Sequence, residues 1–328
     1  MDHDRPTSPG GNLPARPPLR VVFMGTPALA RTVLAALAST PGIDVVGVAA
    51  QPDKPAGRSL QLTPPPVKLE ALERGIPVFQ PAKARDPEFL ARLKELAPDL
   101  VAVAAYGQIL PAAMLAVPRH GCLNVHTSLL PRWRGAAPIQ WTIAEGDAES
   151  GVSLMLMDAG LDTGPVIAEA RTPITDEDTG QSLHDRLAEM GARLLVDSIP
   201  GYVAGSLVPV PQPADGVTYA RKITREDGRL DFTQPARRLW LRSRAFWPWP
   251  GTFCQLPAES GPRLLKVHRV ALDESVSGEP GTVTSAGREG IVVACGTGGL
   301  RFLEVQPEGG KRMTAEQFVA GNRPARFA

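Results

Sequence analysis

Asn124 and His126 stand two residues apart near the end of an apolar run, in the segment "NVHTSLLPRWRGAAPIQ". Side chains alternate along a strand, so the amide and the imidazole lie on the same face. Pro131 and Gly135 then force the chain out of the strand and into a loop. In an open parallel sheet, ligands bind outside the carboxyl ends of the strands. The pair therefore lies where we expect a site.

A third polar group with suitable chemistry is Asp162, in the segment "MDAGLDTGP". The glycines around it indicate a tight loop of the kind that brings a carboxylate close to a ligand. Asp158 is a second candidate in the same loop, and spacing alone does not rank the two. The competing interpretation is structural, because an isolated polar residue at a strand end or between glycines often serves the fold.

Together these groups favour a direct group transfer. An amide and an imidazole can stabilise the oxyanion of a tetrahedral intermediate. A carboxylate can orient the imidazole or take a proton from an attacking amine. Such a transfer needs no nucleophilic Ser, Cys or Lys.

The chain from residue 19 predicts a sheet that brings strand ends together. Short runs rich in Val, Ala and Leu alternate with helical stretches, and near-continuous apolar strands are typical of a sheet buried on both faces. The expected strands are residues 19–25, 44–50, 99–107, 121–128 and 151–158, and the expected helices are 27–39, 87–97 and 179–199, the last with Thr179 as N-cap. The pattern predicts an α/β domain with a doubly wound parallel sheet. The turn "GTPALA" lacks the G-x-G-x-x-G fingerprint, which argues against a nicotinamide dehydrogenase.

A second domain follows a stretch without periodicity. Residues 200–216 are crowded with Pro and Gly, which indicates a linker. Beyond it, a helical stretch at 235–246 precedes short β-like runs, which predict a small antiparallel barrel with the oligonucleotide-binding (OB) type as the leading option. The expected division is a disordered tail (1–18), a catalytic domain (19–204), a linker (205–222) and a C-terminal OB-like β-barrel domain (223–328).

Composition limits the class of protein. With 328 residues, 43% of them hydrophobic and 21% charged, the chain is ordinary for a globular protein with room for two domains. No window approaches the roughly 18 apolar residues that cross a bilayer, and the N-terminal segment lacks the apolar core of a secretory signal. Cys122, Cys254 and Cys295 fit neither a disulfide framework nor a zinc site, which favours a reducing, cytoplasmic setting.

Charge is unevenly distributed although the net formal charge is only +1. Residues 205–328 carry 17 Lys and Arg against 12 Asp and Glu, a net charge of +5. Such an excess suits a nucleic-acid-binding surface, but many basic segments are only solvent-exposed surface. The Pro-rich segment 51–66, with Lys54 and Arg58, is also basic. Compact α/β folds normally use roughly 2 to 6 residues at such a place, so the segment is either a functional arm or a plain insertion.

A set of motifs now points to a family. The segments "VVFMGTP", "QPDKPAGR", "AYGQILP", "NVHTSLLPRWRGAAPIQ", "MDAGLDTGP", "SRAFWPWPGTF" and "GGKRMTAEQF" follow one another along the chain. In order and spacing, the set resembles the methionyl-tRNA formyltransferase family, from about residue 19 to the C-terminus. The resemblance implies a Rossmann-like formyltransferase domain followed by an OB-type barrel. It also implies that a formyl group passes from N10 of the co-substrate 10-formyltetrahydrofolate to the amino group of methionine esterified to initiator tRNA, with no metal ion.

The same resemblance implies the site residues. The family's catalytic Asn, His and Asp fall on Asn124, His126 and Asp162. Its folate-contacting motif falls on Ser128, Leu129, Leu130 and Pro131. Lys54 and Arg58 correspond to the tRNA-contacting arm, but this chain has "SLQLTPPP" where family members commonly carry extra lysines. The basic C-terminal domain is therefore expected to make the remaining phosphate contacts.

Other members of the superfamily use the same three groups. They include glycinamide ribonucleotide transformylase, formyl-folate hydrolases and a sugar-nucleotide formyltransferase that also carries a barrel-like second domain. The segments "QPDKPAGR" and "GGKRMTAEQF" favour the tRNA enzyme over these. A tRNA-binding module on an inert α/β scaffold is a further alternative, against which the complete set of polar groups argues. The expected protein is a cytoplasmic monomer that binds no membrane.

Overall fold

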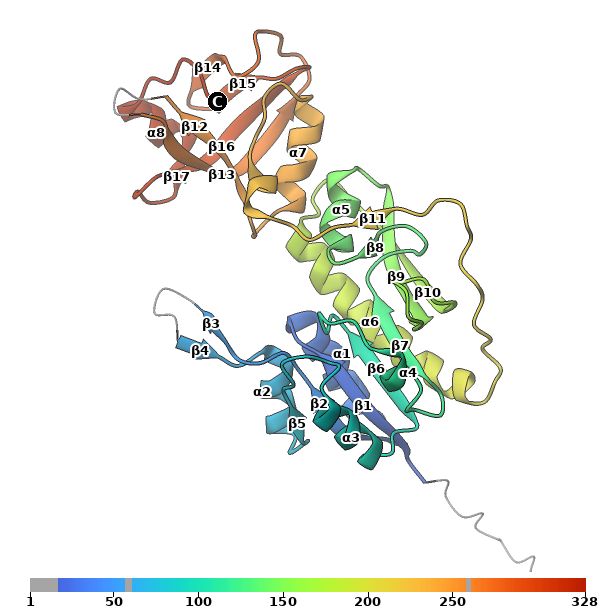
Figure 1. Ribbon diagram of the computed structural model, residues 1–328. Helices are drawn as coiled ribbons and strands as arrows, with labels where there is room; N and C mark the ends of the chain where they lie inside the picture. The colour runs from blue at the N-terminus through green and yellow to red at the C-terminus, as the bar shows by residue number, and fades with distance from the viewer. Residues whose placement is uncertain (1–16, 57–60, 258–260) are drawn as a thin grey trace, which may run out of the picture.

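The computed structural model describes residues 17–56, 61–257 and 261–328 (Figure 1). The predicted tail (1–18) falls almost wholly outside the described residues, and Arg58 is also outside them. Two large sheets follow one another along the chain, the first with an apolar core on each face and the second with a core of its own.

The first sheet is mixed rather than wholly parallel. Its seven strands lie in the order β10-β9-β7-β6-β1-β2-β5. In chain order they are β1 (Leu19–Gly25), β2 (Ile43–Ala49), β5 (Val78–Phe79), β6 (Leu100–Ala104), β7 (Cys122–His126), β9 (Glu149–Leu156) and β10 (Val166–Pro173). Five of them, from β7 to β5, run parallel, as the apolar runs predicted. β9 runs antiparallel to both β7 and β10. The nine residues between β9 and β10 are fewer than a parallel crossover needs, which accounts for the antiparallel pairing of those two strands.

Helices cover both faces of this sheet. They are α1 (Ala28–Ala38), α2 (Pro66–Glu73), α3 (Pro87–Glu95), α4 (Ala112–Leu115), α5 (Pro138–Ala144) and α6 (Gly180–Val203). Along β1, Val21 and Phe23 enter the core that α1 and α6 close, whereas Val22 and Met24 enter the core beneath α3 and α4. Burying each such side chain stabilises the fold by roughly 1.5 to 3 kcal/mol. The predicted doubly wound α/β architecture is confirmed.

The longest helix, α6, begins as predicted. Thr179 Oγ1 accepts a hydrogen bond from Ser182 N at 3.1 Å, and Ser182 Oγ accepts one from Thr179 N at 2.9 Å. This capping box satisfies two backbone donors at the start of the helix. Although α6 has 24 residues, neither it nor any other helix in the described ranges is apolar enough to span a membrane.

The C-terminal domain contains a six-stranded antiparallel sheet covered by α7 (Ala236–Ala245) and α8 (Ala315–Gly321). Its strands are β12 (Thr252–Leu256), β13 (Arg263–Asp273), β14 (Val283–Gly287), β15 (Gly290–Ala294), β16 (Gly299–Pro307) and β17 (Met313–Thr314). The last residues of the chain hydrogen-bond to both edge strands of this sheet. Gln255 N of β12 donates to Ala328 O at 2.6 Å, and Val283 N of β14 donates to Ala325 O at 2.9 Å. The antiparallel prediction is confirmed, whereas the OB type of barrel is not.

Two short strand pairs lie outside the two large sheets. The hairpin of β3 (Lys54–Ala56) and β4 (Gln61–Thr63) projects away from the sheet (Figure 1). In the segment predicted as a linker, β11 (Tyr219–Ala220) pairs in parallel with β8 (Arg134–Gly135). Gly135 has a φ of +118°, and a Cβ there would lie 2.7 Å from Ala220 O. Only glycine fits this close approach.

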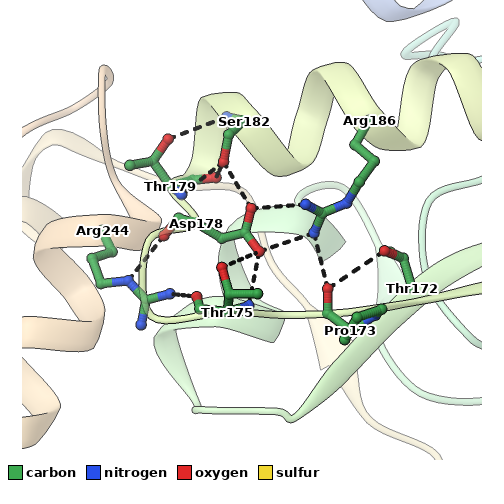
Figure 2. A network of polar contacts seen from close by, with 8 residues as sticks. All are labelled: Thr172, Pro173, Thr175, Asp178, Thr179, Ser182, Arg186 and Arg244. Atoms are coloured by element: carbon green, nitrogen blue, oxygen red, sulfur yellow. Dashed lines mark hydrogen bonds and ion pairs between the residues drawn. The ribbon is translucent and has the colours of Figure 1, made fainter.

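The two domains meet where α7 packs against α5 and the start of α6. The Trp141 and Phe246 rings meet edge to face with centroids 6.0 Å apart. A Cβ on Gly180 would lie 2.3 Å from Ala245 O, so the helix ends touch through backbone. Figure 2 shows Arg244 of α7 directed at the loop before α6, where its guanidinium donates to backbone oxygens.

Candidate active site

The predicted polar groups converge at the carboxyl end of β7. Asn124 and His126 share one face of this strand, and Asp162 comes from the loop between β9 and β10. Asn124 Nδ2 donates to Asp162 Oδ1 at 3.4 Å, and His126 Nδ1 lies 3.8 Å from Asp162 Oδ2. His126 is 5% exposed, and the side chain of Asp162 is 15% exposed. The structure therefore brings all three groups together in a partly enclosed place.

Hydrogen bonding sets the tautomer of His126. Its Nε2 lies 3.0 Å from the backbone oxygen of Trp133. Because a carbonyl oxygen can only accept, Nε2 carries the hydrogen of the neutral ring. Nδ1 is then the nitrogen with a lone pair, on the side of Asp162. The ring is oriented to exchange a proton at Nδ1.

The backbone around these groups adopts uncommon conformations. Asp162 has a φ of 52° and Trp133 a φ of 63°. In this left-handed region a residue other than glycine is strained by about 1 to 3 kcal/mol. The conformations place Trp133 O against His126 and allow Asp162 Oδ2 to accept a hydrogen bond from Gly135 N at 2.8 Å. Such strain is typical of functional sites.

The structure separates the two aspartates that sequence spacing left unranked. Asp158 is exposed, and its Oδ1 accepts hydrogen bonds from Gly160 N at 3.0 Å and from Thr163 Oγ1 at 2.7 Å. These contacts shape the loop in which Asp162 lies. Asp158 is therefore a turn residue, and Asp162 is the carboxylate beside His126.

The predicted folate-contacting motif follows β7, and two hydrogen bonds and one close packing contact fix its conformation. Ser128 Oγ donates to Arg132 O at 2.7 Å, and Leu130 N donates to Ser153 Oγ at 3.0 Å. Leu129 packs over Gly151, where an added Cβ would lie 2.5 Å from its Cδ2. Leu129 and Leu130 also line a pocket of about 370 Å³ whose lining residues do not include the three polar groups.

Beyond Pro131, the turn is anchored on Asp147. The Asp147 carboxylate accepts hydrogen bonds from Arg132, from Trp133 Nε1 at 2.7 Å and from Thr142 Oγ1 at 3.1 Å. Burial would raise the pKa of this carboxyl, but these hydrogen bonds outweigh it and hold the pKa below its usual range. The anchor fixes Trp133, whose carbonyl orients His126.

Of the predicted tRNA contacts, only Lys54 lies within the described residues. It is exposed at the start of the β3–β4 hairpin. The base of the hairpin is held by Asp53, which accepts hydrogen bonds from Gln80 at 2.7 Å and from Lys68 at 2.8 Å. The bonds from Gln80 and Lys68 hold the pKa of the Asp53 carboxyl below its usual range. The start of the hairpin is therefore attached to the catalytic domain.

The three cysteines are poorly suited to nucleophilic chemistry. All three cysteines are buried and free, and burial raises the pKa of Cys122 to about 12 and that of Cys295 to about 11. A neutral buried thiol is a poor nucleophile. Across the ranges that the structure describes, no group of three His, Cys, Asp or Glu side chains is arranged to hold a metal ion.

Sequence reasoning did not find Gln212, which lies in the predicted linker and contacts the loop of Asp162. Its Nε2 donates to the backbone oxygens of Asp162 and Gly164, both at 2.8 Å. The segment around it has no periodic pattern, so nothing in the sequence distinguishes it from other polar linker residues.

Known proteins resemble this chain over nearly its whole length. A family model described as formyl transferase matches residues 19–199, and one described as formyl transferase, C-terminal domain, matches residues 222–323. The methionyl-tRNA formyltransferase of Myxococcus xanthus is 54% identical over 93% of this chain and 96% of its own length. That of Xylella fastidiosa is 53% identical over 93% of this chain and 98% of its own length.

Solved structures share the fold at lower identity. The N-formyltransferase from Helicobacter canadensis, in complex with folinic acid and dTDP-3-aminofucose, is 16% identical, with a TM-score of 0.63 over 90% of this chain and 100% of its own. HypX from Aquifex aeolicus in complex with tetrahydrofolic acid is 16% identical, with a TM-score of 0.58 over 92% of this chain and 47% of its own. At such identities the likeness concerns the fold alone. The curated relatives, in contrast, are 53–54% identical to this chain over 93% of its length, which includes both domains. The chain therefore belongs to the methionyl-tRNA formyltransferase family.

Proposed function

We propose that this chain transfers the formyl group of 10-formyltetrahydrofolate to the amino group of methionyl-tRNA(fMet), which produces the N-formylmethionyl-tRNA that initiates translation. The observation that carries the proposal is the convergence of Asn124, His126 and Asp162 at one strand end. The names of relatives 52–54% identical over 93% of the chain support the substrates.

The reaction begins when the amine nitrogen attacks the formyl carbon bound to N10 of the folate. The carbonyl oxygen becomes an oxyanion in the tetrahedral intermediate, where fixed hydrogen-bond donors are most effective. Asn124 has two amide hydrogens, of which one makes only a long 3.4 Å contact to Asp162. The other is available for the oxyanion. This proposed role makes Asn124 a catalytic donor.

A proton must leave the attacking amine as the new carbon–nitrogen bond forms. Asp162 Oδ2 lies 3.8 Å from His126 Nδ1, which is too far for a hydrogen bond, so in the proposed step the proton passes to the Nδ1 lone pair and the nearby carboxylate stabilises the imidazolium by its charge. With that proton, His126 becomes a second donor to the oxyanion. When the intermediate collapses, the bond to N10 breaks, the carbonyl re-forms and N10 takes the proton. An α-amino group has an unperturbed pKa of about 8, so a mild base is sufficient.

The substrate contacts extend from this centre. Ser128, Leu129, Leu130 and Pro131 form the proposed folate segment directly after β7. The proposed tRNA contacts are Lys54 and Arg58 in the hairpin segment, together with the basic segment 205–328, which has a net charge of +5 and contains the C-terminal domain. In this division, residues 19–204 carry the chemistry, 205–222 connect the domains and 223–328 position the tRNA.

We also propose that the protein acts in the cytoplasm as a monomer. Free, buried cysteines support a reducing compartment. Native mass measurement tests the monomeric state.

Formylation of charged tRNA tests the function. The purified full-length protein is incubated with formyl-folate and either methionyl-tRNA(fMet) or an amino-sugar nucleotide. We expect formylation of methionyl-tRNA(fMet) and no formylation of the amino-sugar nucleotide. Formylation of the sugar alone would instead place the chain with the sugar-nucleotide enzymes in function.

A further inference from the structure

Gln212 bridges the loop that carries Asp162 and strand β8, whose Gly135 N–H donates to the Asp162 carboxylate. Its Nε2 donates to the backbone oxygens of Asp162 and Gly164 at 2.8 Å each. Its Oε1 accepts from Arg134 Nε at 3.0 Å and Nη2 at 2.7 Å. Arg134 is the neighbour of Gly135, whose N–H donates to the Asp162 carboxylate. A single side-chain amide thus holds both partners of that hydrogen bond.

The surroundings show that this contact is specific. Gln212 is half-buried, whereas Pro211 before it and Pro213 to Gly216 after it are exposed. Arg134 is buried at 9% exposure, so its guanidinium requires an acceptor inside the protein. The chain on either side is fixed by backbone bonds, from Val210 to Val166 at 2.8 Å and from Arg134 N to Thr218 O at 2.9 Å.

The held residue needs such support. Asp162 has a φ of 52°, a conformation that persists in a residue other than glycine only where its surroundings enforce it. Relaxation of this backbone would rotate the carboxylate away from Gly135 and His126. Displacements of about 1 Å from productive geometry can reduce turnover as much as 100-fold.

We propose that Gln212 is a positioning residue, which keeps the Asp162 carboxylate in place for proton transfer without touching either substrate. The inference rests on the proposed catalytic role of Asp162. It gives the interdomain segment a part in the chemistry as well as in the connection.

Steady-state formylation of methionyl-tRNA by the full-length protein tests the proposal with three variants. Gln212→Ala removes the hydrogen bonds to Arg134 and those to the backbone oxygens of Asp162 and Gly164. Gln212→Glu keeps an oxygen for Arg134 but sets a carboxylate against the carbonyl oxygens of Asp162 and Gly164. We expect both to lower kcat about 10-fold, with each KM changed less than about twofold. Asp215→Ala, at an exposed position in the same segment, should match the wild type. Wild-type kcat in Gln212→Glu would contradict the claim that the bond from Gln212 to the Asp162 backbone supports turnover.

The double variant separates positioning from general loosening. If Gln212 acts through Asp162, then Gln212→Ala should lower kcat no further in a chain that already carries Asp162→Asn. An equal loss in both backgrounds would overturn the proposal.

Hydrogen exchange decides the matter without reference to activity. The Gly135 amide, bonded to Asp162 Oδ2 at 2.8 Å, should exchange about 10-fold faster in Gln212→Ala, while amides of β1 and β6 keep their wild-type rates. An unchanged Gly135 rate would contradict the bridge even in an active protein. Failure of the proposed function shows differently, as a wild-type protein that does not formylate methionyl-tRNA or as an Asp162→Asn variant with full turnover.

Discussion

Arg244 Nε donates to the backbone oxygen of Asp178 at 2.9 Å, and this bond joins the first helix of the C-terminal domain to the loop before α6 (Figure 2). Another nitrogen of the same guanidinium donates to Thr175 O. Arg244 is buried at 9% exposure and also stacks over Trp240, with its Cζ 4.4 Å from the ring centroid. The placement of one domain on the other therefore depends on a buried, charged donor as well as on apolar packing.

Arg244→Ala should loosen this interface. Hydrogen bonds to charged groups contribute about 1.5 to 3 kcal/mol each, so we expect the free energy of unfolding to fall by about 2 to 4 kcal/mol. Because the C-terminal domain positions the tRNA in the proposed function, the KM for methionyl-tRNA should rise more than the KM for formyl-folate. Denaturant unfolding and steady-state kinetics measure the two effects. Arg237→Ala, exposed on the same helix, is the control for stability and should unfold like the wild type.

The loop that receives Arg244 gives stability a defined pH dependence. Burial would raise the pKa of the Asp178 carboxyl, but hydrogen bonds from Arg186, Thr175 N and Ser182 outweigh it and lower the pKa to about 2. An unfolded Asp has a pKa of about 3.9. The contribution of Asp178 is therefore complete above about pH 4 and is lost as the pH falls toward about 2.

Denaturant unfolding between pH 5 and about 2.5 measures this contribution as the difference between the wild type and Asp178→Asn. We expect the wild type to be more stable at pH 5 and the difference to shrink as the pH falls. A difference that stays constant across the window would show that Asp178 is not responsible for the pH dependence.

The fold could be predicted from the sequence where burial on both faces decides the pattern. The continuous apolar runs of β1 and β6 and the capping residue Thr179 were predicted correctly because propensity and burial agree there. The parallel direction predicted for β9 was wrong, since an apolar run looks the same whether its neighbouring strand is parallel or antiparallel. β10 was not among the expected strands, so the short loop that pairs it with β9 could not be used.

From residue patterns alone, the placement of the candidate side chains was predictable only on regular elements. Asn124 and His126 follow from strand alternation in β7. Spacing alone did not distinguish Asp158 from Asp162, because their difference arises from backbone conformation and from the bond to Gly135 across the fold. Gln212 could not be predicted, because the interdomain segment has no periodic pattern and Asp162, which it contacts, lies 50 positions earlier in the chain.

His126→Ala and Asp162→Asn should each reduce kcat by at least about 100-fold, the usual scale for losing an acid-base or electrostatic group. Asp162→Asn keeps an oxygen for Gly135 N, so it removes charge with little change in shape. Asn124→Ala should act similarly, because it removes the amide donor. Single-turnover formylation with saturating substrates measures the loss. Tight binding of tRNA should persist in all three variants.

Asp158→Asn is the matched control for Asp162→Asn, because both change one carboxylate to an amide in the same loop. Among the residues that the structure describes, Asp158 bonds only to Gly160 and Thr163 of its own loop. We expect its turnover to stay within about fivefold of the wild type, since it does not contact the proposed reacting groups. If Asp158→Asn lost as much turnover as Asp162→Asn, the assignment of the base would have to be revised.

Lys54 and Arg58 provide a test of the proposed tRNA arm. Removing one phosphate-binding side chain should weaken binding of methionyl-tRNA and reduce the slope of log affinity against log salt concentration by about 1. Lys54→Ala and Arg58→Ala are compared with Lys83→Ala, an exposed lysine outside the hairpin that gives the same change in net charge. Binding of formyl-folate should depend far less on salt than binding of tRNA in every variant.

Arg58→Ala further distinguishes an arm that orients the substrate from one that only attracts it. An arm that fixes the acceptor end should contribute to transition-state geometry, so the variant should raise the KM for tRNA and also lower kcat. An arm that only adds attraction would change KM alone. If kcat/KM for charged initiator tRNA stayed at the wild-type value, the segment would be a passive insertion. The phosphate contacts would then belong to the linker and the C-terminal domain, since 17 Lys and Arg outnumber 12 Asp and Glu between residues 205 and 328.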